Sequence, residues 1–454
     1  MLSRLKENIG FYLILAVLAV LGFNISPVAL VISVLMLFGY IYKEQYWKAF
    51  FLFYFVLVLS DSSFIYTFSD TIKPVFALIL PLMGALLSRR YSDMELPTKG
   101  FAIYLLIALF QMFSSPDILM SFQKTLSYAL IFLGMPLVLY SILQTKGLSF
   151  FKDLYGFFVL MLWVGLLLIL LYSDLAFRAA RFSGLFLNPN GLGLFLIVSF
   201  LLFKLVQSKY PGLFTKREGW IVEITMISSL ILTQSRNAIA VFVLFYLLQW
   251  IFKRSQLLGI FSFFILIIFY STLITQLPLI ISALGLEEYF RLDTLAEGSG
   301  RLLAWEFAWQ KVQENFFFGK GISYTEQLYL ENTYQLSRLG HQGNAHNTYL
   351  TIWLDTGLIG LMVFLGAFLF VFLRKAVRSP LALPIMFCLL FSMNFESWLS
   401  ASLNPFTTIF IFIVSILNIP SGLEEKLKRE EYQVEETDLS LQSEANLGLS
   451  NEIK

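Results

Sequence analysis

Long apolar runs recur from one end of this 454-residue sequence to the other, broken by glycine, proline or clusters of charge. A helix needs about 20 apolar residues to cross the hydrocarbon core of a bilayer. Because the runs are solidly apolar rather than alternating, we expect helices and not a β-barrel. The fourteen expected spans lie at about 9–23, 27–42, 46–60, 71–87, 100–113, 125–144, 154–172, 189–207, 219–233, 237–252, 257–275, 348–373, 381–395 and 402–418.

Composition supports this fold class. Hydrophobic residues make up 58% of the chain and charged residues 14%, against about 45–50% and about 25% in soluble domains. These values exclude a soluble globular enzyme and a disordered chain. Lysine and arginine number 32 against 30 aspartates and glutamates, which leaves no cationic excess for binding nucleic acid. We therefore predict an all-α, polytopic membrane helical bundle with about 12–14 transmembrane helices.

The positions of lysine and arginine predict the orientation, because cytoplasmic loops are rich in these residues. With both termini in the cytoplasm, all but ten of the 32 basic residues fall in cytoplasmic segments. An even number of spans with both ends inside fits this bias at nearly every loop. A cleaved signal peptide at residues 1–23 is disfavoured, because further spans follow at once and no A-x-A site is clear. The ten basic residues expected outside are Lys73, Lys124, Arg178, Arg181, Arg236, Arg291, Arg301, Lys311, Lys320 and Arg338.

One connection is much longer than the others. We expect residues 276–347 to form an outer loop with short helices, and loops of this length are more often functional than simple linkers. The membrane-embedded domain covers residues 1–418. Residues 419–454 are polar and acidic, and we expect them to form a disordered cytoplasmic tail.

The outer arginines are few, so their positions need a reason. Arg178 and Arg181 precede the expected helix start at Pro189, for which Asn188 or Asn190 is a candidate N-cap.

Two further arginines lie in short outer segments. Arg236 sits in a hinge so short that its charge lies at the membrane surface or just within it. Arg301 opens an expected interfacial amphipathic helix, with Ser299 near its N-cap. The residues that recur at helical spacing in this helix are Trp305, Ala308, Trp309 and Val312.

Arginines from separate loops would together form a site for a polyanion, because a guanidinium group binds phosphate oxygens in a bidentate way. Helix N-termini near residues 189–191 and 299–301 would add backbone donors. The alternative is that each arginine anchors the chain at the interface or pairs with a nearby acid.

Histidine is rare in this chain, and both residues, His341 and His346, fall in one short segment. His346 directly precedes the expected span 348–373, for which Asn347 or Thr348 is the candidate N-cap. An imidazole at this helix mouth suits proton abstraction near neutral pH. The alternatives are a polar loop histidine and a two-histidine metal site, although no tight cluster of further ligands accompanies the pair.

Three other residues near the last spans are candidates. Asp355 lies within the apolar run that follows His346, and intramembrane carboxylates are functional candidates by default. A helix whose first turns project above the membrane would instead place Asp355 near the headgroups. Glu396 and Trp398, in the outer turn between the last two spans, are weaker candidates.

Several familiar motifs are missing. The chain has no GxxxxGK[ST] loop and no GxSxG elbow. Acidic pairs of the D-x-D kind, which hold a metal on a nucleotide sugar, are also absent from the sequence. ATP-driven transport and a nucleotide-sugar donor are therefore disfavoured, and a lipid-linked sugar is the expected donor.

Four motifs over about residues 181–360 have a recognisable order. They are Arg-Phe-Ser-Gly-Leu-Phe-Leu-Asn-Pro-Asn from Arg181, Gln-Ser-Arg-Asn-Ala around Arg236, Gly-Ser-Gly-Arg-x-x-x-Trp around Arg301, and His-Asn-Thr-Tyr-Leu from His346. Through these motifs the chain resembles the bacterial O-antigen ligase and polysaccharide polymerase superfamily of integral membrane glycosyltransferases.

The resemblance implies an enzyme of the inner, cytoplasmic membrane that works without metal or cofactor. On the outer leaflet it would transfer a glycan from an undecaprenyl-pyrophosphate carrier to an acceptor sugar hydroxyl. Arg236 and Arg301 would hold the pyrophosphate with help from Arg181, and His346 would take the proton of the attacking hydroxyl. Asn237 departs from the family, which often has a small residue after the arginine of the second motif. The other candidates for substrate binding are Arg178, Asn190, Asn347 and Asp355.

Ligases and polymerases share these motifs. A ligase attaches the glycan to lipid A–core, whereas a polymerase extends another lipid-linked repeat unit. The span number and the abundance of phenylalanine and isoleucine, which suggests an AT-rich genome, favour a polymerase of surface polysaccharide, for which a chain-length regulator is a candidate partner.

Two alternatives belong to other classes. A flippase for lipid-linked glycans should carry charge along many spans and show internal pseudo-symmetry, whereas the early spans here carry almost none. A structural scaffold is disfavoured by the outer arginines and histidine.

Overall fold

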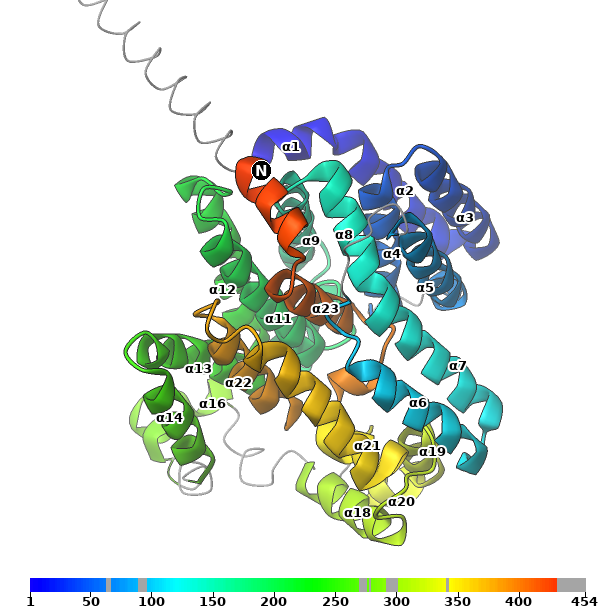
Figure 1. The fold of residues 1–454 in the computed structure, drawn as a ribbon, viewed down its shortest axis with the longest axis vertical. Coiled ribbons are helices and arrows are strands. Elements are labelled where there is room, and N and C mark those ends of the chain that lie inside the picture. Colours follow the sequence, from blue (N-terminus) through cyan, green and yellow to red (C-terminus); the bar gives the residue numbers. More distant parts are fainter. Residues whose placement is uncertain are drawn as a thin grey trace, which may run out of the picture.

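The computed structural model describes residues 1–62, 67–88, 96–268, 276, 279–290, 301–339 and 343–430. Helices make up nearly all of its regular structure, which confirms the predicted all-α bundle (Figure 1). Two short strands, β1 (Phe177–Arg178) and β2 (Arg181–Phe182), pair in an antiparallel hairpin. The two alanines that join the strands have positive φ angles of 48° and 60°, as in the two-residue turns that match strand twist.

The N-terminal half consists of helices joined by short connections. The π-helix η2 (Leu130–Gly134) joins α7 to α8, and the 3-10 helix η1 (Met112–Ser114) extends α6. The α-helices are α1 (Leu2–Glu7), α2 (Ile9–Asn24), α3 (Ser26–Tyr42), α4 (Tyr46–Ser60), α5 (Thr67–Ser88), α6 (Phe101–Gln111), α7 (Ile118–Ala129), α8 (Met135–Lys146), α9 (Ser149–Leu171), α10 (Ser173–Ala176) and α11 (Pro189–Lys209).

The C-terminal half adds further long helices and a group of short ones. The 3-10 helix η4 (Trp398–Ser400) lies between the last two apolar helices. The α-helices are α12 (Lys216–Thr233), α13 (Arg236–Phe252), α14 (Gln256–Ile268), α16 (Glu287–Phe290), α18 (Arg301–Glu314), α19 (Tyr324–Glu331), α20 (Thr333–Arg338), α21 (Thr348–Leu373), α22 (Ala382–Met393), α23 (Pro405–Leu417) and a final helix, Ser421–Glu430.

Each expected span overlaps a helix, but the helices differ in length. Among the helices of the described residues, seven apolar ones have only 10–17 residues. Helix α23 and the final helix form a pair bent by 90° that is long enough only when taken together. The apolar helices make the chain an integral membrane protein, while the number of crossings stays a prediction. The five described helices that are long and apolar enough to span alone are Phe68–Leu87, Ile118–Lys146, Ser149–Leu171, Pro189–Lys209 and Thr348–Leu373.

Ion pairs join segments that the sequence placed in the cytoplasm. The N-terminal ammonium group contacts Glu218 at the start of α12. Arg4 and Lys146 lie 3.6 Å and 3.1 Å from the buried carboxylate of Asp153 on α9. These contacts bring the starts of α1, α9 and α12 and the end of α8 together at one end of the bundle, which carries the N-terminus in Figure 1.

The final helix differs from the disordered tail that we expected to begin at residue 419. Leu423 and Leu427 are buried, and Lys426 Nζ donates a hydrogen bond of 2.8 Å to a backbone carbonyl of α8. Two apolar side chains four residues apart give this segment a helical face to bury, despite its many charges. The rest of the tail, residues 431–454, lies outside the described residues.

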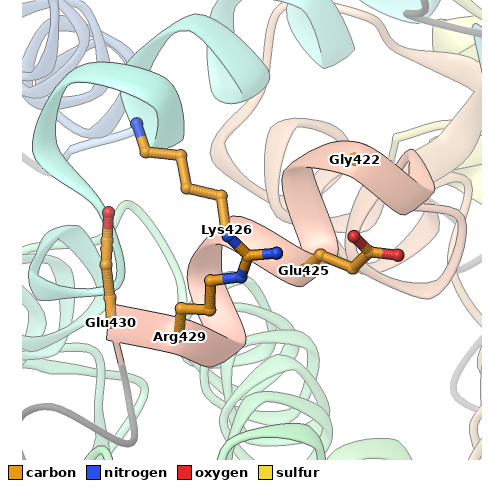
Figure 2. Close-up of a pocket in the computed structure, with 5 residues that line it drawn as sticks. All are labelled: Gly422, Glu425, Lys426, Arg429 and Glu430. Carbon is orange, nitrogen blue, oxygen red and sulfur yellow. The ribbon is translucent and has the colours of Figure 1, made fainter.

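A hollow of about 320 Å³ lies beside this helix, lined by Gly422, Glu425, Lys426, Arg429 and Glu430 (Figure 2). The helix lies next to the N-terminus, and α18 lies at the opposite end of the molecule (Figure 1). The hollow is therefore remote from α18 and its neighbours, where the candidate residues of the outer loop lie.

Two helices of the long loop, α18 and α19, pack against α21. The predicted helix from Arg301 is present as α18, and it buries Ala304, Ala308 and Val312 at intervals of four residues. The buried stripe is thus made of small side chains, while Trp309 is 41% exposed. Ser299, the expected N-cap, lies outside the described residues.

Candidate functional site

The first turn of α21 is fixed by Asn347. Its side chain accepts a hydrogen bond from Leu350 N (3.1 Å), so Asn347, and not Thr348, is the N-cap of the two candidates that the sequence offered. Its backbone N–H donates to Ser397 Oγ (2.8 Å), and its Nδ2 donates to Asn394 Oδ1 (3.2 Å). Asn347 therefore ties the mouth of α21 to the turn that follows α22.

His346 precedes this cap in a left-handed backbone conformation, with φ +44°. Its backbone N–H donates to Asn344 Oδ1 (2.8 Å), a local turn that helps to hold the strained residue. A Cβ added at Gly343 would lie 3.2 Å from His346 Nε2. The glycine thus leaves room beside the ring nitrogen that faces away from Glu396. His341, the other histidine, lies outside the described residues.

Glu396 joins His346 to Arg301. Its Oε1 accepts a hydrogen bond of 2.7 Å from Arg301 Nη2, and its Oε2 lies 3.6 Å from His346 Nδ1. The three side chains come from α18, from the loop before α21 and from the turn after α22. They are 19%, 15% and 30% exposed for arginine, glutamate and histidine, so they are sheltered but reachable from solvent.

The backbone of this turn is also fixed. Thr348 Oγ1 donates to the carbonyl of Glu396 (2.7 Å), and the N–H of Glu396 donates to the carbonyl of Ser392 (3.2 Å). The carboxylate is therefore held in front of α21 by the same first turn that carries His346. The sequence indicated Glu396 only as a weaker candidate, because Arg301 lies 95 residues away along the chain.

A second set of contacts surrounds Arg181, which is 7% exposed. Its Nε donates to the carbonyl of Thr233 (2.9 Å), and its Nη2 donates to Asn190 Oδ1 (2.7 Å). Asn188, not Asn190, is the N-cap of α11, because its side chain accepts from Gly191 N. Arg181 thus ties β2 and the start of α11 to the end of α12, directly before the hinge that carries Arg236.

Arg236 is the first residue of α13, and its Nη1 atom is buried. The hinge is tight because Gln234 has a left-handed conformation, with φ +50°. A Cβ added at Gly193 would lie 2.7 Å from Ser235 Cβ, so the hinge packs directly on the backbone of α11. The ends of α12 and α13 therefore meet the first turn of α11 at this arginine.

One contact links the hinge to the Glu396 turn. Asn237 Nδ2 donates to Ser392 Oγ (3.4 Å), and Ser392 also accepts from the backbone of Glu396. A continuous series of contacts thus connects the hinge of Arg236 with Arg301 and His346. Asn237, which departs from the family pattern, thus forms an interhelical hydrogen bond to α22.

Asp355 is buried inside α21, and its Oδ1 accepts from Thr325 N (2.9 Å) and Thr325 Oγ1 (2.7 Å). Its backbone carbonyl accepts from Gly321 N (2.8 Å). The carboxylate therefore holds the start of α19 against α21. Arg178, in β1, is half-buried and lies opposite Arg181 in the register of the two strands.

Asp61, which the sequence analysis did not single out, lies at the same end of the bundle. Its backbone carbonyl accepts from Leu187 N (2.7 Å), just before α11. Burial raises the pKa of the Asp61 carboxyl to about 7, and the charge of Lys73 opposes this rise. In the sequence Asp61 only marks the end of an apolar run, which is why no pattern pointed to it.

Within the described ranges, no three histidine, cysteine, aspartate or glutamate side chains gather closely enough to hold a metal ion.

Residues 221–365 match the family model described as O-antigen ligase. This match confirms the resemblance drawn from the motifs, and the matched segment contains Arg236, Arg301 and His346. It supports glycosyl transfer of the O-antigen ligase and polymerase type in general. No curated protein matches the chain.

Proposed function

We propose that this protein transfers a glycan from an undecaprenyl-pyrophosphate carrier to an acceptor sugar hydroxyl on the outer face of the cytoplasmic membrane, and that it extends surface polysaccharide by repeat units. The observation that carries the proposal is the joining of a cation, Arg301, to a base, His346, through Glu396 at the mouth of α21. The family match supports the reaction class, and the motif resemblance supports the donor.

In this proposal the arginines act on the donor. The bond between the anomeric carbon and the phosphate oxygen breaks, and negative charge develops on the pyrophosphate that leaves. Arg301 and Arg236 stabilise that charge, because fixed cations placed where charge develops lower the barrier. Arg181 and Asn190 support the Arg236 hinge through their own hydrogen bond, and Arg178 and Asn190 stay predictions for direct substrate contact.

His346 acts on the acceptor. Its Nε2 takes the proton of the attacking hydroxyl while the acceptor oxygen forms its bond to the anomeric carbon on the face opposite the leaving group. Its Nδ1 faces Glu396, whose carboxylate stabilises the imidazolium that forms. Asn347 and Asp355 act through position, because the first caps α21 and the second holds α19 against it.

This chemistry requires no metal. Transfer should therefore persist at full rate after exhaustive chelation of divalent cations. Strict dependence on an added divalent cation would contradict the assignment of His346 as the base.

A ligase that attaches the glycan to lipid A–core is the second candidate, favoured by the description of the matching family. The surface glycan of a deletion strain discriminates between the two. Single repeat units on the acceptor would show a lost polymerase, and long polymer accumulated on the lipid carrier would show a lost ligase. Repeat units confined to the inner leaflet would identify a flippase, and an unchanged glycan would contradict all three functions.

A further inference from the structure

The carboxylate of Glu396 contacts both Arg301 and His346, and the two contacts differ in length. The contact to Arg301 is 2.7 Å long, as expected of a hydrogen bond between charged groups. The contact to His346 is 3.6 Å long, beyond hydrogen-bonding distance. The carboxylate therefore holds the arginine more closely than the imidazole.

We propose that Glu396 is an internal competitor of the donor: it occupies Arg301 until the donor's pyrophosphate displaces it, and it then closes on His346 Nδ1. This inference rests on the proposed function, because it takes the donor to be a prenyl pyrophosphate held by Arg301. It adds a positioning role for Glu396 that couples donor binding to the orientation of the base.

The geometry allows this exchange with a small movement. The backbone of Glu396 is fixed on both sides, by Thr348 Oγ1 and by Ser392. To form a hydrogen bond with His346 Nδ1, Glu396 Oε2 has to move by less than about 1 Å, from its distance of 3.6 Å. A pyrophosphate carries more negative charge than one carboxylate and binds a guanidinium group in a bidentate way, so it can displace Glu396 from Arg301.

The exchange has a consequence for the order of the reaction. While Glu396 holds Arg301, its Oε2 stays 3.6 Å from His346 Nδ1 and stabilises the protonated ring less than a direct hydrogen bond would. After the donor binds, the same carboxylate is released to the ring. The acceptor hydroxyl therefore loses its proton only when the donor is in place, and the donor binds first.

The test is a Glu396→Gln variant of the full chain in lipid nanodiscs, with farnesyl pyrophosphate as the binding probe. Because the variant removes the internal competitor, we expect it to bind the probe about fivefold more tightly than the wild type, as for the loss of a sheltered ion pair worth about 1 kcal/mol. At saturating donor, its turnover should fall at least about tenfold, because the base has lost its carboxylate. The matched control is Glu306→Gln, an exposed carboxylate on α18, which should change neither value.

Equal or weaker probe binding by a folded Glu396→Gln variant would overturn the proposal. If that variant does not fold, nitrogen NMR of the ring in a His341→Gln chain, which leaves His346 as the single histidine, provides a second measurement. Farnesyl pyrophosphate should move the Nδ1 signal to that of a hydrogen-bonded N–H, and an unmoved signal with the probe bound would overturn the proposal. Failure of the wild type to bind the probe at all would instead contradict the proposed function.

Discussion

Single residues around the candidate site are held in conformations that cost free energy. His346 and Gln234, one beside the base and one in the hinge of Arg236, both have positive φ angles. Such conformations persist where the surrounding structure fixes them, and they cluster at functional sites. His346 is held by the hydrogen bond from its backbone N–H to Asn344 Oδ1, and the hinge that contains Gln234 is held by its close packing on Gly193. Backbone strain and close local contacts thus occur together at His346 and in the hinge that carries Arg236.

Replacing Arg301 or Arg236 by lysine should lower transfer by about a hundredfold, because a point charge cannot reproduce the bidentate fork on a phosphate group. The measurement is the initial rate of polymer formation by each purified variant. Arg338→Lys, an exposed arginine on α20, is the control and should keep the wild-type rate. Wild-type rates in both site variants would show that these arginines are simple surface anchors.

Asp61 should make stability depend on pH. Its carboxyl has a pKa of about 7 in the folded chain and about 4 in an unfolded one, so the folded chain binds the proton more tightly. Stability should therefore fall as the pH rises from about 4 to about 7, by at most about 4 kcal/mol from this group.

The variant Asp61→Asn should remove this dependence and raise the melting temperature at pH 8 more than at pH 4. The exposed Asp174→Asn serves as the control. A parallel pH profile for Asp61→Asn and the wild type would contradict the prediction.

The sequence identified the individual arginines and the histidine of the candidate site, but it gave Glu396 only as a weaker candidate and did not predict its place between Arg301 and His346. Scarcity made the outer cations conspicuous, and the position of His346 before an apolar run made its helix mouth predictable. Glu396 lies in a different turn of the chain, and only the packing of α22 beside α21 brings it to Arg301. Contacts of that kind carry no periodicity and no motif, so single-sequence reasoning could not find them.

At the scale of one element, α21 is interrupted where the sequence predicted a continuous helix. Gly357 has φ +69° and ψ −179°, which only glycine adopts readily. The segment before α19 enters this break, because Leu358 N donates to the carbonyl of Phe316 (2.9 Å) and Gly321 N donates to that of Asp355. A glycine inside an apolar run leaves the hydropathy pattern unchanged, which is why the break was not predicted.

The variant Gly357→Ala should destabilise the protein by roughly 2–3 kcal/mol. Its Cβ would lie 2.3 Å from the carbonyl oxygen of Phe317, and its backbone would be strained. The measurement is the melting temperature in detergent. Gly366→Ala, in the same helix with nothing within 4 Å of its added Cβ, should be neutral or slightly stabilising. Equal melting temperatures for the two variants would contradict the break at Gly357.

At the scale of the whole molecule, the apolar runs predicted the helices well because burial in a membrane requires little more than length and hydrophobicity. The number of crossings stays a prediction, since seven of the described apolar helices are shorter than about 20 residues and one pair is bent by 90°. The charged tail differs from the prediction, because its segment Ser421–Glu430 forms a helix that buries Leu423 and Leu427. The sidedness of the bundle rests on the lysine and arginine bias.

That sidedness can be tested with introduced cysteines. The native Cys388 is fully buried and should not react. In intact cells, a membrane-impermeant thiol reagent should label Glu306→Cys on α18 and should label Lys426→Cys only after lysis. The reverse pattern would place the candidate site on the cytoplasmic side and contradict the proposed function.

The most direct test of the account is transfer by the purified chain in liposomes, with a lipid-linked repeat unit as both donor and acceptor. The wild type and the His341→Ala variant should form extended polymer, whereas the His346→Ala variant should form none while retaining the elution and melting profile of the wild type. Polymer of normal length and amount from the His346→Ala variant would contradict the central claim, that the imidazole at the mouth of α21 takes the proton of the acceptor.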